Sequence, residues 1–549
     1  MSRRLQDLLS LQAERRADSR ALIFNGCQMT YGELELASNR LARTLKASGC
    51  ARGDRVMLLL PKSIEAIVAM FAALKADCIY VPLDTASPAV RLARIVEVCK
   101  SRFVLATSST SALLNEIRHS GVSDELRVGW MDGGATLHCG MRAAFYWGNV
   151  LQMSPSAVDS QNSDDNAAHI LFTSGSTGLP KGVIITHSNI LQFVDWAVPY
   201  FGMGPSDRIS GQPPLHFDLS MLDIYGSIAA GAQLHLVPPH LSILPHALAA
   251  FIRAGALTQW FSVPSLLHYM AKLDVVRQND FPSLRRLLWC GEKFPAPALI
   301  YWMRRVPHAR FFNLYGPTET TIASSCYQVQ YCPESETAEI PIGSPCDGEQ
   351  LLVLDDQLCP VPAGQTGDLY IAGLGLSPGY WNDPTKTREV FLPVTPGLVP
   401  SGRIYKTGDL ARIGNDGELY LVGRSDSQIK SRGYRIELGE IEAALHTIAG
   451  VEDAAVVAIG ADGFEGATIC CAYVPSAGSE LSILSVKKQL SGVLPAYMLP
   501  SRWMILDRMP RNGNGKVDRP TIKEQFRRQA LSPTSVVLDQ RHKEALGAA

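Results

Sequence analysis

The chain has 549 residues, of which 46% are hydrophobic and 19% charged, so it can bury a large core in more than one domain. Its formal net charge of -1 gives no electrostatic basis for binding nucleic acid or an anionic membrane surface. The apolar run at residues 66–74 is too short to cross a bilayer, so we expect neither nucleic-acid binding nor stable membrane insertion.

The cysteines give no sign of a metal site or a disulfide framework. All twelve are scattered without a Cys-x-x-Cys pair or a metal-ligand spacing. A chain of this length does not need disulfides for stability, and its charged N-terminus lacks the apolar core of a secretory signal. We therefore expect reduced thiols and a cytoplasmic protein.

The first third of the chain alternates predicted helices and strands. Thr30 and Glu33 form a capping box, so a helix begins there. Residues 56–60 are typical of a buried strand, residues 64–75 of a helix, and residues 78–82 of the next strand. This alternation predicts parallel α/β layers. Polar residues 152–166 are then predicted to form an exposed loop.

Residues 173–183, TSGSTGLPKGV, follow an apolar run at 169–172 that predicts a short buried strand. Glycines at 175, 178 and 182 let backbone N–H groups turn toward one point, the hydroxyls add donors, and Lys181 adds a cation. This combination suits a polyphosphate, although a Gly/Ser/Thr run can also be an ordinary surface loop. It is not the P-loop pattern, because Gly182 rather than Ser or Thr follows Lys181.

Asp218 lies in a largely apolar neighbourhood, HFDLSMLD at residues 216–223. A buried carboxylate without a partner is costly, so this one is expected to face a cation. Spacing alone favours a different role, an N-cap for a predicted helix at residues 220–230, because Asp is a good cap.

Several polar motifs follow in the second half of the chain. NLYGPTET occupies residues 313–320, YKTGDL 405–410, GRSDSQIK 423–430 and NGNGKVDR 512–519. Asp416 and Gly417 predict a hairpin turn. In isolation, Tyr315 is most simply a core tyrosine and Lys516 a solvated lysine. A carboxylate such as Asp409 can accept two O–H donors from a vicinal diol.

Together, these ordered motifs resemble the adenylate-forming enzymes, which include acyl- and aryl-CoA ligases, luciferases and the adenylation domains of non-ribosomal peptide synthetases. The resemblance covers roughly residues 20–520. It implies an α/β fold with a large N-terminal domain, residues 1–425, of layered α/β subdomains plus a β-barrel-like subdomain. A small mobile α+β C-terminal domain at 426–528 would follow the hinge residue Asp426, before a flexible tail at 529–549.

One family motif, at residues 74–84, has Asp77 and Cys78 where a Gly-Ala pair is usual. We interpret that position as structural.

The resemblance also implies ATP and Mg²⁺ as cofactors, with Glu319 as the metal ligand. Its catalytic residues would be Lys516, Lys181, Thr318 and Glu319. Asn313 would bind the adenine amino group, Tyr315 would stack on the base, and Asp409 would bind the ribose hydroxyls. The full set predicted to bind ATP or AMP is Thr173, Ser174, Gly175, Ser176, Thr177, Gly178, Gly291, Glu292, Asn313, Tyr315, Gly316, Asp409 and Arg424.

In amino-acid-activating members of the family, the Asp at position 218 binds the substrate α-ammonium. The resemblance therefore predicts an amino acid, held by Asp218, Leu219, Leu222, Ser262, Leu288, Cys290, Leu314, Ile322 and Ala323. Because Asp218 is the charged member of this set, the substrate side chain should be neutral. Leu314 narrows the pocket and favours glycine, then alanine. Proline stays open, because stand-alone prolyl activators share the Asp-Leu-Leu start.

The closest resemblance is to stand-alone aminoacyl–carrier protein ligases, such as D-alanine–carrier protein ligases and the glycine-activating ligase of lipid A glycylation. It implies that the amino acid is activated as aminoacyl-AMP and passed to the phosphopantetheine thiol of a carrier protein acting in trans. An acyl- or aryl-CoA ligase is the alternative, against which Asp218 argues. A degenerate, non-catalytic member is a third, against which the intact Lys516 and Glu319 argue.

Overall fold

The computed structural model describes residues 3–531 except 124, 134–141, 176–177, 395–398, 400–401, 461–466, 480 and 514. Ser176 and Thr177 of the predicted phosphate loop, and residues 532–549 of the predicted tail, lie outside the described residues. By its internal contacts, the chain divides into a large unit, Met1–Thr173 and Pro180–Asp426, and a small unit, Ser174–Leu179 and Ser427–Ala549. In the described part of the chain, no helix is long and apolar enough to cross a membrane.

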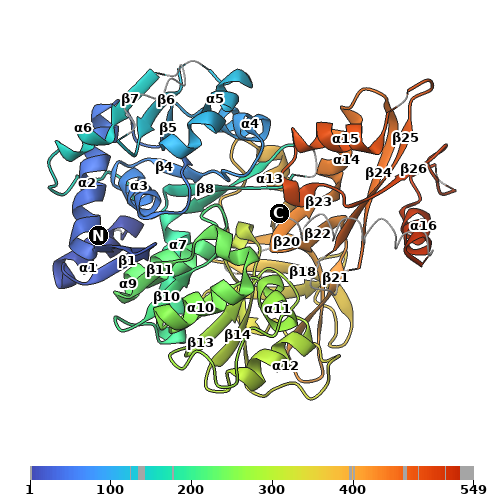
Figure 1. The fold of residues 1–549 in the computed structure, drawn as a ribbon. Coiled ribbons are helices and arrows are strands. Elements are labelled where there is room, and N and C mark those ends of the chain that lie inside the picture. Colours follow the sequence, from blue (N-terminus) through green and yellow to red (C-terminus); the bar gives the residue numbers. More distant parts are fainter. Residues whose placement is uncertain are drawn as a thin grey trace. The chain divides into compact units, whose positions relative to one another are not determined.

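The large unit contains a seven-stranded sheet in the order β7-β6-β5-β3-β4-β8-β9, parallel except for the β8–β9 pair (Figure 1). Its strands are β3 (Arg55–Leu59), β4 (Ile79–Pro82), β5 (Phe103–Ala106), β6 (Arg127–Trp130), β7 (Arg142–Tyr146), β8 (Ala167–Thr173) and β9 (Lys181–Thr186). The helices between these strands are α3 (Ile64–Lys75), α4 (Ala89–Cys99), η1 (Ser108–Thr110), α5 (Ser111–His119) and α6 (Trp147–Leu151). Several strands are buried throughout, as the predicted parallel α/β layers require.

Capping residues next to each helix determine where the helices of this region begin. Helix α2 (Tyr31–Ala47) begins at the predicted capping box, where Glu33 N–H donates to Thr30 Oγ1 at 3.2 Å and Thr30 N–H to Glu33 Oε2 at 2.8 Å. Helix α3 has the predicted bounds and is capped by the Ser63 hydroxyl. Both predicted helices are confirmed.

The backbone conformation and contacts at position 77 explain why Asp can replace the usual Gly of the family motif. Its backbone is left-handed, with φ +61, a conformation that Gly adopts without strain and Asp tolerates. The carboxylate accepts hydrogen bonds from Gln161 N–H at 3.1 Å and Lys46 Nζ at 3.2 Å. Asp77 therefore fastens the polar segment before β8, which is a structural role.

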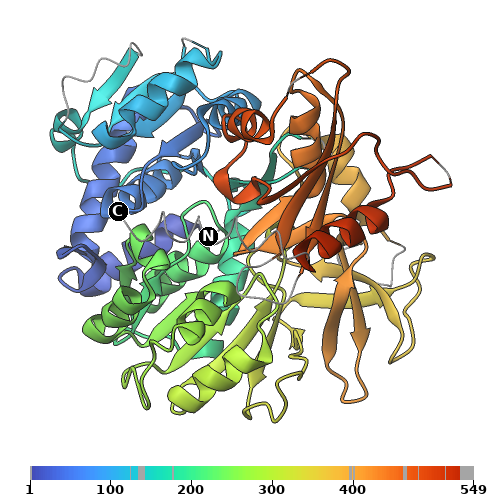
Figure 2. The same cartoon turned by 45° about the vertical axis from the view of Figure 1, so that its right-hand side comes forward.

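A second, nine-stranded sheet has the order β16-β15-β14-β13-β12-β10-β11-β1-β2. Its strands are β1 (Arg20–Phe24), β2 (Cys27–Thr30), β10 (Arg208–Gly211), β11 (Gln233–Leu236), β12 (Gln259–Ser262), β13 (Arg286–Trp289), β14 (Arg310–Tyr315), β15 (Ser325–Val329) and β16 (Ser344–Pro345). In Figures 1 and 2, helices α10, α11 and α12 group beside its central strands. The helices of this region are α1 (Leu5–Arg16), α7 (His187–Phe201), η3 (Pro239–Ile243), α10 (Pro245–Gly255), α11 (Pro264–Lys272), α12 (Ala296–Arg305) and η4 (Thr318–Thr320).

The helical segment after Asp218 is less regular than its sequence predicts. It consists of α8 (Leu219–Met221), a π-helical stretch, η2 (Leu222–Gly226), and α9 (Ser227–Ala230). A π turn contains one residue more than an α-helical turn, and the spacing of apolar residues in the sequence does not predict it. Such turns are frequent near functional sites.

The rest of the large unit is an antiparallel sheet of β17 (Glu349–Leu354), β18 (Thr366–Gly373), β19 (Phe391–Pro393), β20 (Arg403–Ile413) and β21 (Leu419–Arg424), with helix α13 (Pro384–Val390). The predicted hairpin at Asp416-Gly417 joins β20 to β21, and Gly417 has φ +80. This is the predicted barrel-like subdomain, but in the described residues its sheet stays open, because β17 pairs with β18 alone.

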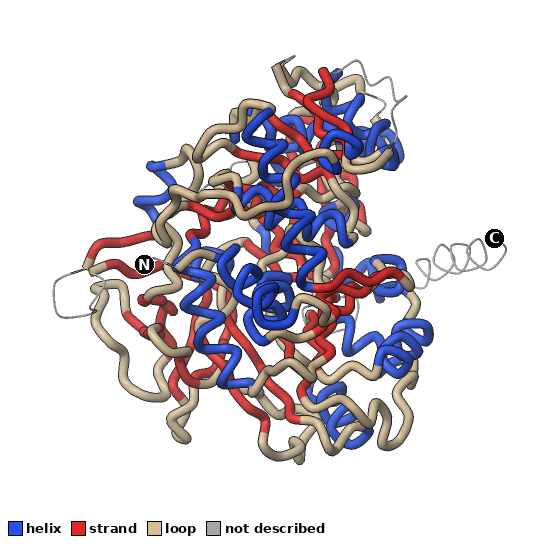
Figure 3. Tube along the Cα trace, turned by 90° about the vertical axis from the view of Figure 1, so that its left-hand side faces the viewer, coloured by secondary structure: helices blue, strands red, loops and turns tan. Residues whose placement is uncertain are grey.

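Helices and strands are mixed throughout the described chain (Figure 3, helices in blue and strands in red), and the small unit is α+β. Its elements are β22 (Gln428–Ser431), β23 (Tyr434–Glu437), α14 (Leu438–His446), β24 (Val451–Ile459), β25 (Thr468–Pro475), α15 (Ile483–Ser491), η5 (Ala496–Met498), β26 (Arg502–Ile505) and α16 (Arg519–Leu531). It has its own apolar core, in which Ile436, Ile441 and Tyr473 are fully buried.

Candidate active site

The predicted phosphate loop connects β8 and β9, whose ends pair in register at Thr173 and Lys181. Gly178 has φ +82, so this turn needs a glycine. The Thr173 hydroxyl is buried without a hydrogen-bond partner in the described part of the chain. Because buried hydroxyls are normally satisfied, this atom is a candidate ligand contact.

The loop's described residues bond to strand β23 and to the first turn of helix α14 in the small unit. Ser174 Oγ donates to the Arg435 carbonyl at 2.7 Å, and Gly175 N–H donates to Glu440 Oε2 at 3.1 Å. Glu440 is buried. These two bonds explain why this segment groups with the small unit although its neighbours in sequence belong to the large one.

Asp218 precedes α8, but its side chain makes no capping hydrogen bond. Its Oδ2 instead accepts a hydrogen bond from Thr318 Oγ1 at 2.7 Å, although the two residues are 100 positions apart. Asp218 is only 9% exposed. The capping interpretation of this carboxylate is therefore wrong, and the structure brings two predicted site residues together.

Glu319 follows Thr318 and is fully buried. Its Oε1 accepts a hydrogen bond from Tyr380 Oη at 2.7 Å, and Lys181 Nζ lies 5.9 Å from the centre of the Tyr380 ring. The sequence analysis does not include Tyr380 among the predicted site residues. Its only local signal is an aromatic residue directly after Gly379.

The Glu319 carboxylate fits a magnesium ion whose coordination is completed by oxygen atoms of the substrate phosphates. Mg²⁺ is usually held by one or two carboxylates plus phosphate oxygens, and a buried carboxylate gains from a nearby cation. Within the described ranges, no group of three or more His, Cys, Asp or Glu side chains is arranged to hold a metal by itself. Glu319 therefore suits a nucleotide-bound metal better than a metal caged by protein alone.

Three predicted nucleotide-binding residues form a continuous chain of hydrogen bonds. Tyr315 Oη donates to Asp409 Oδ2 at 2.6 Å, and Arg424 Nη1 donates to Asp409 Oδ1 at 2.6 Å. Burial and the neighbouring Asp409 raise the pKa of Tyr315 well above its usual value, so the phenol stays protonated as a donor. Both oxygens of the Asp409 carboxylate are thus fixed in place. Arg424 also bonds bidentately to Asp426, the last residue of the large unit.

The remaining predicted nucleotide contacts lie at the ends of β13 and β14. Asn313 donates its amide N–H to the Pro341 carbonyl at 2.7 Å, which orients the side chain. Gly316 allows a close approach, because a Cβ there would lie 2.6 Å from Ala323 Cα. Gly291 has φ +96, and the adjacent Glu292 accepts a hydrogen bond from Ser265 N–H at the start of α11. Glu292 thus contacts a helix N-terminus.

The predicted substrate-pocket residues are mostly apolar and buried together. Leu288, Cys290 and Leu314 lie near one another because β13 and β14 pair at Trp289 and Asn313. Ser262 accepts a hydrogen bond from Trp260 Nε1 at 2.9 Å, which fixes its hydroxyl. The members of the set that share one apolar cluster are Leu219, Leu222, Leu288, Cys290, Leu314, Ile322 and Ala323.

The turn after Thr320 is strained. Thr321 and Ile322 both have positive φ, +63 and +70, which is unusual for β-branched residues. Such conformations cost about 1–3 kcal/mol each and concentrate at functional sites. The Thr321 hydroxyl holds the turn by donating to the Gly375 carbonyl at 2.7 Å.

Lys516 belongs to the small unit and lies in a loop closed by an antiparallel bridge between Arg511 and Val517. Its backbone N–H donates to Asn512 Oδ1 at 3.1 Å, and the residue is exposed.

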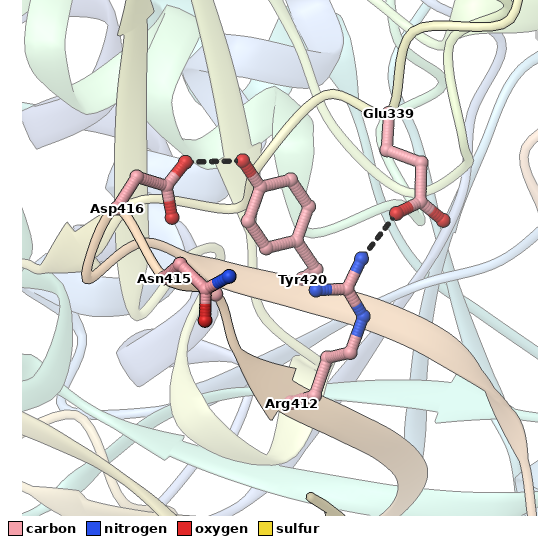
Figure 4. A pocket seen from close by; sticks show the side chains of 6 residues that line it. Glu339, Arg412, Asn415, Asp416 and Tyr420 are labelled. Carbon is pink, nitrogen blue, oxygen red and sulfur yellow. Dashed lines mark hydrogen bonds and ion pairs between the residues drawn. The ribbon is translucent and has the colours of Figure 1, made fainter. Parts of the chain in front are cut away.

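A separate cavity of about 370 Å³ lies beside the β20–β21 hairpin (Figure 4). Tyr420 Oη donates to Asp416 Oδ2 at 2.6 Å, and Arg412 forms an ion pair with Glu339. The lining residues are Glu339, Arg412, Gly414, Asn415, Asp416 and Tyr420. None of the predicted site residues is among these.

The AMP-binding enzyme family matches residues 9–381, and the AMP-binding enzyme C-terminal domain matches residues 440–516. An L-proline–[L-prolyl-carrier protein] ligase of Pseudomonas fluorescens is 35% identical over 499 residues, which are 90% of this chain and 94% of that protein. Tyrocidine synthase 3 of Brevibacillus parabrevis is 34% identical over 522 residues, which are 95% of this chain but only 8% of the synthase.

Among solved structures, the Vibrio cholerae adenylation domain AlmE, crystallised with glycyl-adenosine-5'-phosphate, superposes with a TM-score of 0.82 and 24% identity. The match covers 95% of this chain and 97% of AlmE. At this identity, the match establishes the fold: a large α/β N-terminal part followed by a small C-terminal part.

Proposed function

The chain belongs to the AMP-binding enzyme family of adenylate-forming ligases, and we propose that it activates a small neutral amino acid, glycine in the first place and alanine in the second. The aminoacyl group then passes from the adenylate to the phosphopantetheine thiol of a separate carrier protein. The observation that carries the amino-acid assignment is the buried Asp218 carboxylate, which accepts a hydrogen bond from Thr318 among apolar residues.

Asp218 binds the substrate α-ammonium. A carboxylate and an ammonium about 4 Å apart attract each other by roughly 4 kcal/mol at an effective dielectric constant near 20, before desolvation. An acid without an amine does not gain this attraction. This asymmetry selects amino acids over simple acyl and aryl acids.

The walls around Asp218 select a small side chain. Leu314 is 2% exposed and Cys290 1%, and Cys290 Sγ lies 3.9 Å from the Ile322 carbonyl, so this side of the site is closely packed. A pocket of glycine size excludes alanine by steric clash. An alanine-sized pocket, in contrast, disfavours glycine by only about 1–3 kcal/mol. The bulk of Leu314 therefore supports glycine.

ATP binds to the residues that flank this pocket. Asn313 contacts the adenine amino group, Tyr315 stacks on the base, and Asp409 accepts the ribose hydroxyls while Arg424 holds it in place. The phosphates lie along the 173–178 loop and Lys181. Bound Mg²⁺, held by Glu319, supplies positive charge to the phosphate oxygens.

In the first step, a carboxylate oxygen of the amino acid attacks the α-phosphorus of ATP, and pyrophosphate leaves. Both reactants are anionic, so positioning and positive potential account for most of the catalysis. Lys516 and Lys181 stabilise the developing charge. In the second step, the carrier thiol attacks the acyl carbon and AMP leaves, after the small unit has moved about Asp426.

Proline is the alternative substrate. The prolyl–carrier protein ligase of P. fluorescens, at 35% identity over nearly its whole length, supports it. A proline ring needs more room than glycine, so the two candidates make opposite predictions about how tightly Leu314 and Cys290 close the pocket.

The test is ATP–pyrophosphate exchange with glycine, both alanines, serine, proline, β-alanine and an aryl acid without an amine. We expect the strongest exchange with glycine. A dominant proline signal would favour the prolyl alternative, and exchange with the aryl acid alone would contradict the role of Asp218.

Lys516→Ala should lower the exchange rate about 10²–10³-fold, the usual cost of removing one stabilising group from a charged transition state. Unchanged exchange in this variant would contradict the role given to Lys516. Comparing CoA with a phosphopantetheinylated carrier as acceptor separates a carrier ligase from a CoA ligase.

A further inference from the structure

Residues 375–381, which we call the strap, connect two parts of the proposed nucleotide site through backbone hydrogen bonds. On one side, Ser377 N–H donates to the Glu319 carbonyl at 2.9 Å. On the other, Trp381 N–H donates to the Gly182 carbonyl at 2.7 Å, and Ile184 N–H to the Gly379 carbonyl at 3.1 Å. The strap is therefore held both at Glu319 and at the strand that begins with Lys181.

The position of Tyr380 within the strap is closely determined. Its N–H donates to Thr387 Oγ1 at 3.0 Å, and it forms a β-bridge with Val183. The preceding Gly379 has φ +138, and a Cβ there would lie 2.4 Å from Thr387 Cγ2, so no larger residue fits without rearrangement. This packing leaves Tyr380 only 5% exposed.

The Tyr380 side chain contacts both charged groups that the strap connects. Its hydroxyl donates to Glu319 Oε1 at 2.7 Å, and the Lys181 ammonium lies 5.9 Å from its ring centre, within cation–π range. A hydrogen bond to one oxygen of a fully buried carboxylate restricts how that carboxylate can turn, and the negative face of the Tyr380 ring attracts the ammonium. One side chain thereby orients two opposite charges.

We propose that Tyr380 is a positioning residue for metal–nucleotide binding, which aims the Glu319 carboxylate at the metal and keeps the Lys181 ammonium beside the phosphates. This inference rests on the proposed function for its ligand, ATP with a divalent metal. Groups that hydrogen-bond metal ligands set the ligand's orientation, and their loss costs about 10–100-fold in metal affinity or activity.

The test variant is Tyr380→Phe, which removes the hydroxyl but keeps the ring. The matched control is Tyr420→Phe, since Tyr420 also donates to a carboxylate, Asp416, at 2.6 Å but in an exposed setting. Binding of Mn²⁺ in the presence of ATP is measured by electron paramagnetic resonance, and binding of metal-free ATP by calorimetry. We expect Tyr380→Phe to weaken Mn²⁺ binding about 10–100-fold and metal-free ATP binding much less.

If Tyr380 acts through Glu319, the effects of the two substitutions on Mn²⁺ affinity should not be additive. In a Glu319→Gln background, Tyr380→Phe should add little to the loss of Mn²⁺ affinity, because the two changes remove one shared function. Excess Mg²⁺ should also restore much of the pyrophosphate exchange of Tyr380→Phe. Tyr380→Leu, which removes the ring as well, should additionally weaken metal-free ATP binding by several-fold.

Equal Mn²⁺ affinity in Tyr380→Phe and the wild type would overturn the inference, as would equal losses in Tyr380→Phe and Tyr420→Phe. The binding assay needs no amino acid. A wild-type protein that binds Mn²⁺ and ATP but exchanges with no amino acid would therefore contradict the proposed function, while the Tyr380→Phe comparison would still decide the inference.

Discussion

Two regions of the large unit combine the same three kinds of side chain. At the proposed active site, Tyr380 donates to Glu319 and lies beside Lys181. At the open cavity, Tyr420 donates to Asp416, and the Arg412 guanidinium lies 4.8 Å from the centre of the Tyr420 ring (Figure 4). A carboxylate, a tyrosine and a cation are thus arranged similarly in both regions.

The two clusters differ in burial. Glu319 is fully buried, whereas the Glu339 side chain that pairs with Arg412 at the cavity is 48% exposed. Water competes for charges at an exposed site and screens them, so interactions of the same geometry are worth far less there. A measurable cavity with polar walls is therefore a weaker indication of function than a buried, hydrogen-bonded charge.

The largest difference in activity between the two regions should come from replacing Asp218 at the active site and Asp416 at the cavity. Asp218→Asn removes the charge proposed to bind the ammonium, and we expect kcat/KM for amino-acid-dependent pyrophosphate exchange to fall about 10²–10³-fold, equivalent to roughly 3–4 kcal/mol. Asp416→Asn at the cavity is the control and should leave exchange unchanged. Similar losses in both variants would show that burial does not distinguish the two regions.

Glu349 sharpens the comparison, because its Oε2 atom is buried while the residue as a whole is half-buried, and among the described residues no tyrosine or cation pairs with it. Its Oε1 accepts from Gly375 N–H at 2.7 Å, its Oε2 has no partner in the described part of the chain, and burial raises its pKa from 4.5 to about 8. The folded protein therefore keeps a proton that the unfolded chain releases, so the free energy of unfolding falls as pH rises from about 4.5 to about 8.

Glu349→Gln should abolish this pH dependence. Because the amide stays neutral, the variant should resemble the wild type near pH 4.5 and exceed it by a few kcal/mol in free energy of unfolding above pH 8. Urea unfolding at both pH values measures the difference. A constant offset at all pH values would mean that Glu349 titrates alike in the folded and unfolded chain.

The smallest effect is expected from the exposed ion pair at the cavity. Arg412→Ala should change the free energy of unfolding by no more than about 1 kcal/mol, and added salt should reduce that change. Pyrophosphate exchange serves as the second readout and should stay at the wild-type level. A large loss of exchange would give the cavity a role that its exposure argues against.

Residues whose signals are local were predictable from sequence. The capping box at Thr30 placed the start of α2, and the turn at Asp416-Gly417 placed the β20–β21 hairpin. Family motifs also brought Asp218 and Thr318 into one predicted site, and their side chains are 2.7 Å apart. Spacing alone favoured a helix cap for Asp218, because the N-cap prediction depends only on the few residues that follow in sequence and takes no account of Thr318.

What escaped prediction depends on contacts between distant segments. Tyr380 is 61 positions from Glu319, and its partners are set by the way the strap pairs with β9. The π turn at Leu222–Gly226 and the positive φ of Ile322 have no local sequence signal either, because tertiary packing imposes both conformations. The open edge of the β17–β21 sheet likewise follows from strand pairing rather than from composition.

The small unit is discontinuous in the chain, and this matters for engineering. A chimera joined between Asp426 and Ser427 would import a foreign α14 but keep the native Ser174–Leu179 segment. Its graft would have to supply both acceptors of that segment, the carboxylate that binds Gly175 N–H and the carbonyl that binds Ser174 Oγ. A recombination site chosen by linear sequence alone separates these donors from their acceptors, so exchanging residues 174–179 together with the C-terminal part is the more compatible graft.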